Sequence, residues 1–232
     1  MLRQIRLLVF DLDYIIFDCS LLKLQALRQS LISLSDGIPP HVRLPDAIDI
    51  ESAFREHGRL WIRSLDLEMG EESLADLERV YDVHEHRLIE AGVGRIYGGI
   101  SEVLLACRSQ GIASALGAEA SREYLMAVSD HHDLDRYFEI SLCTEEYGRG
   151  GAGEMLSDAL DRAEVNPSET LVFGARPALF DAGRALDLFT VGCGWGLQQK
   201  DALDTADFQS PTVDRILQVI RRIDEIAAQY AG

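Results

Sequence analysis

Lysine is almost missing from this chain of 232 residues, because only Lys23 and Lys200 occur among its 22 basic residues. This scarcity limits which side chains can supply an ammonium group to a reaction. Basic residues as a whole are outnumbered, since 39 acidic residues against 22 basic ones give a formal net charge of −17. Binding to nucleic acid or to an anionic membrane depends on clustered lysine and arginine. We therefore expect neither of these partners.

Cysteine is sparse and widely spaced, at positions 19, 107, 143 and 193. No two cysteines are separated by two residues, and none is grouped with histidine at zinc-finger spacing, so we expect buried, reduced thiols. Long apolar runs are missing as well. The run at the start of MLRQIRLLVFDLD is a few residues long and ends in two acids, which is too short for a signal peptide or a membrane span. These absences predict a cytoplasmic protein.

The chain does have enough apolar content for a full core, because 47% of its residues are hydrophobic. Residues 5–10, IRLLVF, have the pattern of a short buried strand, and DLD follows at once. From about residue 92 onward, strand and helix patterns alternate. The further strand segments are 112–118, 137–144, 169–175 and 189–196. This alternation predicts a parallel sheet covered by helices on both faces.

Residues 18–91 have a different character. The segments LLKLQALRQSLISL, DIESAFREHGRLWIRSL and EESLADLERVYDVHEHRLIEAG carry apolar residues three and four positions apart, which is typical of amphipathic helices. We therefore predict a doubly wound α/β core from residues 1–17 and 92–232, with an all-helical domain inserted at 18–91. Because it follows the first strand directly, this insertion is expected to act as a lid that excludes water from the chemistry of Asp11 and Asp13.

Asp11 and Asp13 directly follow the first strand, one residue apart. As a carboxylate, Asp11 can attack phosphorus, while Asp13 can protonate the leaving alcohol and later activate water. Asp11, together with the main-chain carbonyl of Asp13, can also hold a hard cation through oxygen. Both residues are thus candidate catalytic and metal-binding residues. The alternative interpretation is a pair of solvated acids at a strand end.

Several segments follow one another in a recognisable order. They are LLVFDLDYIIFD, the helical insertion, GGISEVLLACRSQG, YFEISLCTEEYGRG and ETLVFGARPALFDAGRALDLFTVGCGWG. Over nearly the whole chain this order resembles the haloacid dehalogenase-like (HAD) superfamily of hydrolases, in its capped phosphatase branch. The resemblance implies a Rossmann-like core, with the all-helical insertion at 18–91 as a mobile cap domain. In active relatives it also implies Mg²⁺-dependent phosphoryl transfer through an aspartyl intermediate. Asp11 and Asp13 match the family's nucleophile and general acid/base, and the second acid implies phosphatase ancestry.

Four other positions of the family pattern hold residues of the wrong chemistry. The family expects a hydroxyl after the second core strand, a lysine after the third, and two acids after LVFG. The residues found there are Ala118, Gly150, Ala175 and Leu179, respectively.

Three nearby residues are the candidates for phosphate binding in place of the missing groups. Ser121 lies three residues beyond Ala118, and Arg149 is adjacent to Gly150. Arg176 is a positive charge beside the expected cation position, where it would repel Mg²⁺ and attract an anion. An arginine does not simply replace a lysine at a tight site, because its planar fork has a different shape.

The leading hypothesis is a HAD-like pseudoenzyme of phosphatase ancestry, weak or inactive as a Mg²⁺-dependent phosphatase. Removing one preorganised group from an active site costs about 2.7–4 kcal/mol of transition-state stabilisation. One alternative is an active phosphomonoesterase that uses Mg²⁺ through a rewired site, with Glu119 or Asp181 as ligands and Arg149 or Arg176 on phosphate. The other is a regulatory module that binds a small phosphorylated or anionic molecule, or a partner protein.

Overall fold

The computed structural model of the protein describes residues 4–34, 44–148, 151–196 and 201–230. The chain divides into two compact units. Met1–Phe17 and Ile96–Gly232 form the core unit, and Asp18–Arg95 form the cap unit. Two short strands that pair with each other, β2 at Phe17–Asp18 and β3 at Arg95–Ile96, lie where the chain passes from one unit to the other.

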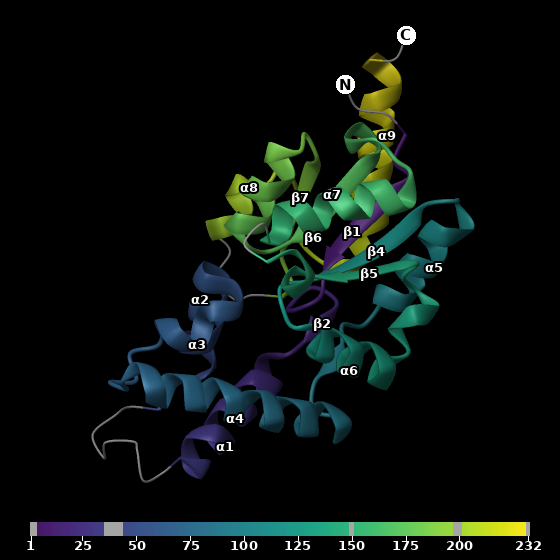
Figure 1. Ribbon diagram of the computed structural model, residues 1–232. Helices are drawn as coiled ribbons and strands as arrows, with labels where there is room; N and C mark the ends of the chain where they lie inside the picture. The colour runs from purple at the N-terminus through teal and green to yellow at the C-terminus, as the bar shows by residue number, and fades with distance from the viewer. Residues whose placement is uncertain (1–3, 35–43, 149–150, 197–200, 231–232) are drawn as a thin grey trace. The chain divides into compact units, whose positions relative to one another are not determined.

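The described part of the core unit contains a six-stranded sheet with the order β5-β4-β1-β6-β7-β8 (Figure 1). The strands are β1 Leu7–Asp11, β4 Ala113–Ala118, β5 Ile140–Cys143, β6 Thr170–Gly174, β7 Phe189–Cys193 and β8 Phe208–Ser210. All neighbouring pairs are parallel. The chain places β4 and β5 on one side of β1 and the later strands on the other. Open α/β sheets bind ligands at the carboxyl ends of the strands beside such a reversal.

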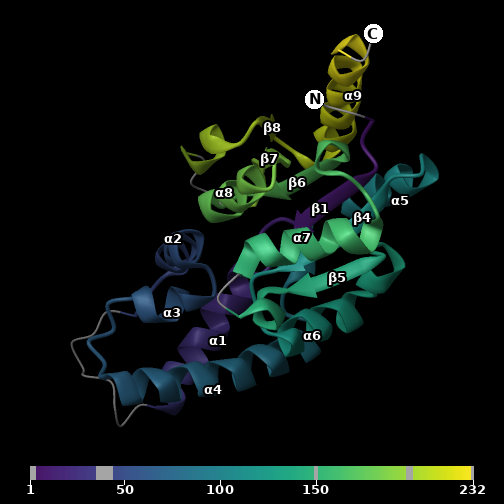
Figure 2. The same ribbon diagram turned by 45° about the horizontal axis from the view of Figure 1, so that its top comes forward.

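Helices pack against both faces of this sheet (Figures 1 and 2). They are α5 Ile100–Ser109, α6 Arg122–His132, α7 Gly151–Ala163, α8 Pro177–Ala185 and α9 Ile216–Tyr230. Helices α7 and α8 cover one face through an apolar cluster that includes Leu7, Val9 and Leu156. Helices α5 and α9 contact the sheet at β4 and β8 and also touch each other. The predicted doubly wound α/β fold is confirmed.

The described part of the cap unit is helical. Its α-helices are α1 Ser20–Ser33, α2 Ala47–His57, α3 Trp61–Ser64 and α4 Glu71–Glu90. Helix α2 begins at a capping box, in which the Asp46 carboxylate accepts hydrogen bonds from the Ile48 and Asp49 amides and the Asp49 carboxylate accepts one from the Asp46 amide. Such reciprocal bonds satisfy amides at the start of a helix that have no partner within it.

The rare residue Lys23 lies inside the cap unit. Its side chain is buried, with the ammonium 4.8 Å from the centroid of the Phe54 ring and 3.8 Å from the Glu85 carboxylate. The same carboxylate accepts a hydrogen bond of 2.5 Å from the Tyr81 hydroxyl. Buried charges are tolerated where they are paired and hydrogen-bonded. This lysine therefore belongs to the packing of the cap.

Strand β8 was not predicted. It is three residues long, and only Ser210 of its side chains is fully buried. A strand of this length at the edge of a sheet carries no apolar alternation that sequence reasoning can detect.

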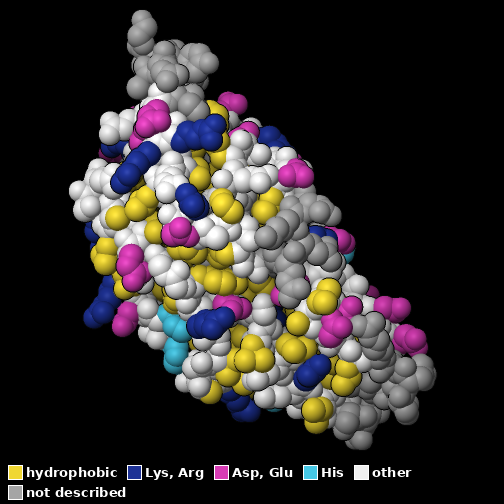
Figure 3. Space-filling model, turned by 180° about the vertical axis from the view of Figure 1, so that it is seen from behind, with side chains coloured by type: hydrophobic (Ala, Val, Ile, Leu, Met, Phe, Trp, Pro, Cys, Tyr) yellow, Lys and Arg dark blue, Asp and Glu magenta, His cyan; other side chains and the backbone are white. Residues whose placement is uncertain are grey.

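Charged side chains of both signs are interspersed on the face of the molecule that Figure 3 shows, as far as its residues are described. The lysine and arginine side chains of this face lie singly among acidic and apolar ones. None of the described helices combines the length and the apolar content that crossing a membrane requires.

The turn that follows β1 is packed against a loop that follows β7. All side chains of residues 12–17 are buried, and Tyr14 has a positive φ of 63°. The indole N–H of Trp195 donates to the carbonyl oxygen of Ile15 over 3.0 Å. Gly196 approaches so closely that a Cβ placed on it would lie 1.8 Å from the carbonyl oxygen of Tyr14. This loop therefore fixes the turn that carries Asp13.

We expect Gly196→Ala to destabilise the protein, because the added methyl group would meet the backbone of Tyr14 rather than a movable side-chain end. Overpacking of this kind costs about 1–3 kcal/mol, occasionally more. Urea unfolding followed by circular dichroism measures the loss. The control is Gly98→Ala, where a Cβ has no neighbour within 4 Å, so its effect should stay within about 0.5 kcal/mol. Equal stability of the two variants would contradict the contact.

Candidate functional site

Three adjacent strands bring charged residues to the point where the strand order reverses. Asp11 is the last residue of β1, and Glu119 directly follows β4. Arg176 lies two residues beyond β6, at the position that precedes α8. Because β4, β1 and β6 are neighbours and parallel, their carboxyl ends lie side by side. The fold thus gathers residues that are far apart in the sequence.

Arg176 bridges the two carboxylates of this group. Its Nε and Nη2 atoms each donate to Oδ2 of Asp11 over 3.3 Å, and its Nη1 atom donates to Oε2 of Glu119. The side chains of Arg176 and Asp11 are only 4% and 5% exposed, and that of Glu119 is 22% exposed. We call this arrangement the Arg176 bridge. It pairs a buried positive charge, which would be costly to leave unpaired.

Asp13 is held by a partner from another helix. The hydroxyl of Tyr124, on α6, donates to Oδ1 of Asp13 over 2.6 Å, and both residues are buried. A tyrosine hydroxyl bonded to a carboxylate oxygen restricts the orientation of the carboxyl group. Asp13 therefore has a fixed orientation, set by the loop after β7 and by α6.

The charge states within the bridge follow from burial and from pairing. Burial raises the pKa of Asp11 from 3.8 to about 6, Arg176 opposes this rise, and the charges of Asp13 and Glu119 add to it. Asp11 is therefore mostly ionised at neutral pH. Burial works against the charged form of Arg176, but Asp11 and Glu119 raise its pKa above the usual value. The guanidinium thus stays charged.

The other candidate residues are placed as follows. Ser121 is the N-cap of α6, and its hydroxyl accepts a hydrogen bond from the Tyr124 amide over 3.2 Å. The alternative ligand Asp181 is exposed on α8, where it pairs with Arg184. Arg149 lies outside the described residues. The structure thus brings together Asp11, Glu119 and Arg176, while the Ser121 hydroxyl serves a helix cap.

Sequence reasoning did not find Tyr124 or the partners of Arg176. Tyr124 is 111 positions from Asp13, and Arg176 is 165 positions from Asp11. No local sequence pattern indicates that two residues so far apart in the chain are in contact. The one available signal was topological, since residues after adjacent parallel strands meet at one edge of the sheet.

The positions where acids were expected after β6 are apolar and buried. Ala175 and Leu179 are each 3% exposed. Leu179 belongs to the apolar cluster beneath α7 and α8, and its Cδ2 atom would lie 2.5 Å from a Cβ placed on Gly174. Its side chain therefore packs over the end of β6.

Comparison with known proteins identifies the family. The family described as haloacid dehalogenase-like hydrolase matches residues 5–187. The chain belongs to this HAD family. No curated protein matches the chain in sequence. The order of motifs along the sequence thus predicted the family correctly.

Solved structures of HAD-family proteins share the fold. A haloacid dehalogenase-like family hydrolase from Streptococcus pneumoniae has a TM-score of 0.79 at 14% identity, covering 93% of this chain and 98% of its own. Beta-phosphoglucomutase from Clostridium difficile has a TM-score of 0.72 at 18% identity, covering 96% and 98%. CbbY from Rhodobacter sphaeroides, in complex with phosphate, has a TM-score of 0.73 at 15% identity, covering 90% and 95%. At such identities the likeness shows the phosphatase-family fold.

HAD phosphatases generally use Mg²⁺, which requires a near-octahedral shell of oxygen ligands. In this HAD protein, Oδ2 of Asp11 accepts two guanidinium N–H groups and Oδ1 of Asp13 accepts the Tyr124 hydroxyl. The described residues contain no group of three or more His, Cys, Asp or Glu side chains that could hold a metal ion. The adjacent guanidinium would also repel a divalent cation. The residues therefore do not fit Mg²⁺.

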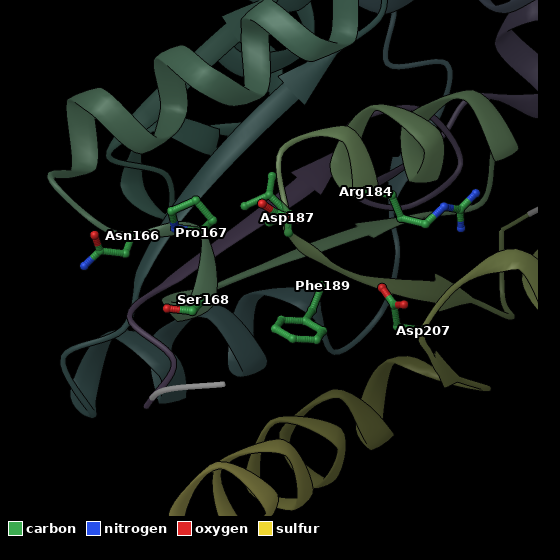
Figure 4. A pocket seen from close by; sticks show the side chains of 8 residues that line it. Asn166, Pro167, Ser168, Arg184, Asp187, Phe189 and Asp207 are labelled. Carbon is green, nitrogen blue, oxygen red and sulfur yellow. The ribbon is translucent and has the colours of Figure 1, made fainter. Parts of the chain in front are cut away.

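A hollow of about 710 Å³ lies in the HAD core away from the Arg176 bridge, at the amino ends of β6 and β7 (Figure 4). Three of its polar side chains, those of Asn166, Arg184 and Asp207, are bonded within the fold. Asp207 accepts hydrogen bonds of 2.8 Å from the amide and the hydroxyl of Thr190, the Asn166 amide group donates to Glu169, and Arg184 pairs with Asp181. This hollow lies at the edge of the sheet opposite to the carboxyl ends of the strands.

Proposed function

We propose that this protein is a HAD-family pseudoenzyme of phosphatase ancestry that does not perform Mg²⁺-dependent hydrolysis of phosphomonoesters. The observation that carries the proposal is the Arg176 bridge. In it, a side chain of the protein supplies positive charge to Asp11, at the place where a catalytic cation would have to act.

The charges of the site argue against binding of a phosphate dianion. The Arg176 guanidinium bonds to the carboxylates of Asp11 and Glu119, and the charge of Asp13 also acts on Asp11. In a buried site the Coulomb repulsion between like charges is much stronger than in water. An incoming phosphate would therefore meet a net negative environment.

The chemistry of Asp11 argues the same way. A nucleophilic carboxylate needs its negative charge and a charge-stabilised target, and the Arg176 guanidinium bonds to Asp11 and offsets the charge of the attacking group. Stabilisation of the developing charge by preorganised groups is commonly worth about 2.7–4 kcal/mol for each group. The apolar Ala175 and Leu179 supply none of it. We infer that the role of the protein is binding or regulation rather than turnover.

One observation favours a second candidate function, a phosphomonoesterase that needs no metal. Both contacts between Arg176 and Asp11 fall on Oδ2, so Oδ1 is not used by the guanidinium. In this alternative, Arg176 orients Asp11 while Oδ1 attacks phosphorus, and Asp13 protonates the leaving alcohol. Its activity would be insensitive to chelation.

The test is release of inorganic phosphate from a panel of phosphomonoesters, including para-nitrophenyl phosphate and sugar phosphates, with excess MgCl₂ and with EDTA. We expect no release by the purified protein above that of its Asp11→Asn variant in either condition. Mg²⁺-stimulated turnover that Asp11→Asn removes would overturn the proposal. Turnover that persists in EDTA, and that both Asp11→Asn and Arg176→Ala remove, would establish the second candidate.

A further inference from the structure

We propose that Asp11 and Glu119 form a cation-binding site, that the chain fills this site with its own Arg176 guanidinium, and that the site accepts a small planar cation from solution when that side chain is removed. The inference rests on the proposed function, in which no divalent cation occupies this place. It adds the chemical class of ligand that the site is shaped for.

The geometry of the site fits a guanidinium. Oδ2 of Asp11 accepts two N–H groups, and Oε2 of Glu119 accepts a third from the opposite side of the same planar group. Planar N–H donors match carboxylate acceptors in this way, whereas a hydrated divalent ion requires oxygen donors in an octahedral arrangement. The site thus selects by shape as well as by charge.

The two carboxylates do not depend on Arg176 for their positions along the backbone. Asp11 lies in the central strand β1, paired with Gly117 of β4, and Glu119 follows that strand directly. Shortening Arg176 to alanine would therefore leave two converging carboxylates around a vacated volume. A polar cavity of this kind takes up water or a charged ligand, whereas an apolar one stays empty.

The site is reachable from solution at one carboxylate. Glu119 has 22% of its side chain exposed, compared with 5% for Asp11. A small cation can thus be captured first at Glu119 and then reach Asp11. The negative charge of the protein as a whole favours the approach of cations.

The experiment is thermal unfolding of Arg176→Ala during titration with methylguanidinium chloride. We expect a saturable rise in Tm, because a ligand that binds only the folded state stabilises it. The double variant Asp11→Asn, Arg176→Ala should show no such rise, and neither should the original protein. Since guanidinium salts weaken folding in general, the matched control is Arg184→Ala, which loses an exposed guanidinium from α8, the helix that follows Arg176.

Titration with MgCl₂ tests the selectivity for shape. We expect no Mg²⁺-dependent rise in the original protein or in Arg176→Ala. The proposal is overturned if Arg176→Ala is folded and methylguanidinium gives no rise beyond that of Arg184→Ala. It is also overturned if MgCl₂ stabilises the original protein in a manner that Asp11→Asn removes, because Arg176 would then not fill the site.

Refolding provides a second readout if Arg176→Ala does not fold by itself. Native circular dichroism should then return in methylguanidinium chloride but not in sodium chloride, and the double variant should stay unfolded in both. Failure of the cation site is distinguishable from failure of the proposed function. Mg²⁺-dependent phosphatase activity of the original protein would contradict the proposed function. If the original protein is inactive and Arg176→Ala binds no cation, only the inference of a cation site is contradicted.

Discussion

Arg176→Ala should lower the free energy of unfolding by about 3–5 kcal/mol, the cost found when one partner of a buried ion pair is removed. The reason is that two carboxylates from adjacent strand ends, those of Asp11 and Glu119, lose their shared guanidinium. Asp11 is buried and cannot recover this loss through water. Its remaining route is to take up a proton, which itself costs free energy at neutral pH.

Urea unfolding at neutral pH measures this loss, with Arg184→Ala as the control. Arg184 is exposed and pairs with an exposed carboxylate on the same helix, so its removal should cost at most about 1 kcal/mol. Arg176→Lys should fall between the two, because an ammonium keeps the charge but lacks the fork that reaches both carboxylates. A loss below about 1 kcal/mol for Arg176→Ala would mean that the bridge contributes no more than an exposed ion pair.

Asp11 should make the stability of the protein fall as the pH rises from about 4 to about 6. Burial raises the pKa of Asp11 from 3.8 to about 6, although Arg176 opposes the rise. Between these values the folded protein holds a proton that the unfolded chain has released, so stability declines with pH. The stabilisation is complete below 3.8 and is lost as the pH passes 6. At about 1.36 kcal/mol for each pKa unit, the loss amounts to roughly 3 kcal/mol.

The measurement compares urea unfolding of the original protein with that of Asp11→Asn at a series of pH values across this range. Other acids titrate in both proteins, so the difference between the two curves isolates Asp11. We expect that difference to change by about 2 kcal/mol in favour of the original protein on going from pH 6 to pH 4, and by about 3 kcal/mol over the full titration. Parallel curves would show that the carboxyl group titrates near its ordinary value.

The fold was predictable from the sequence because its signals are local. Alternating apolar strand segments and amphipathic helices specify a parallel α/β sheet within windows of ten to fifteen residues. Asp11 and Asp13 could be placed at a strand end for the same reason. Residues 18–91 were predicted to form a separate helical domain because three amphipathic segments occur there without a strand pattern between them.

The charge pairing of the site was not predictable in this way. Arg176 was expected to attract an anion from solution, and the structure gives it two carboxylates of the protein as partners. Which charges become neighbours depends on the tertiary arrangement of β4, β1 and β6, and no spacing in the sequence encodes it. The Tyr124 hydroxyl that fixes Asp13 could not be found either, because it comes from a helix 111 positions away.

Under the proposed function, the Arg176 bridge also removes the need for a metal ion from the surroundings of the protein. The occupancy of a bound metal ion depends on the concentration of that ion in solution, and a chelator can remove it. The Arg176 guanidinium is part of the polypeptide. Every molecule of the protein therefore carries one, whatever the protein concentration. The folded population of this protein should thus stay the same in magnesium-starved and magnesium-replete cells.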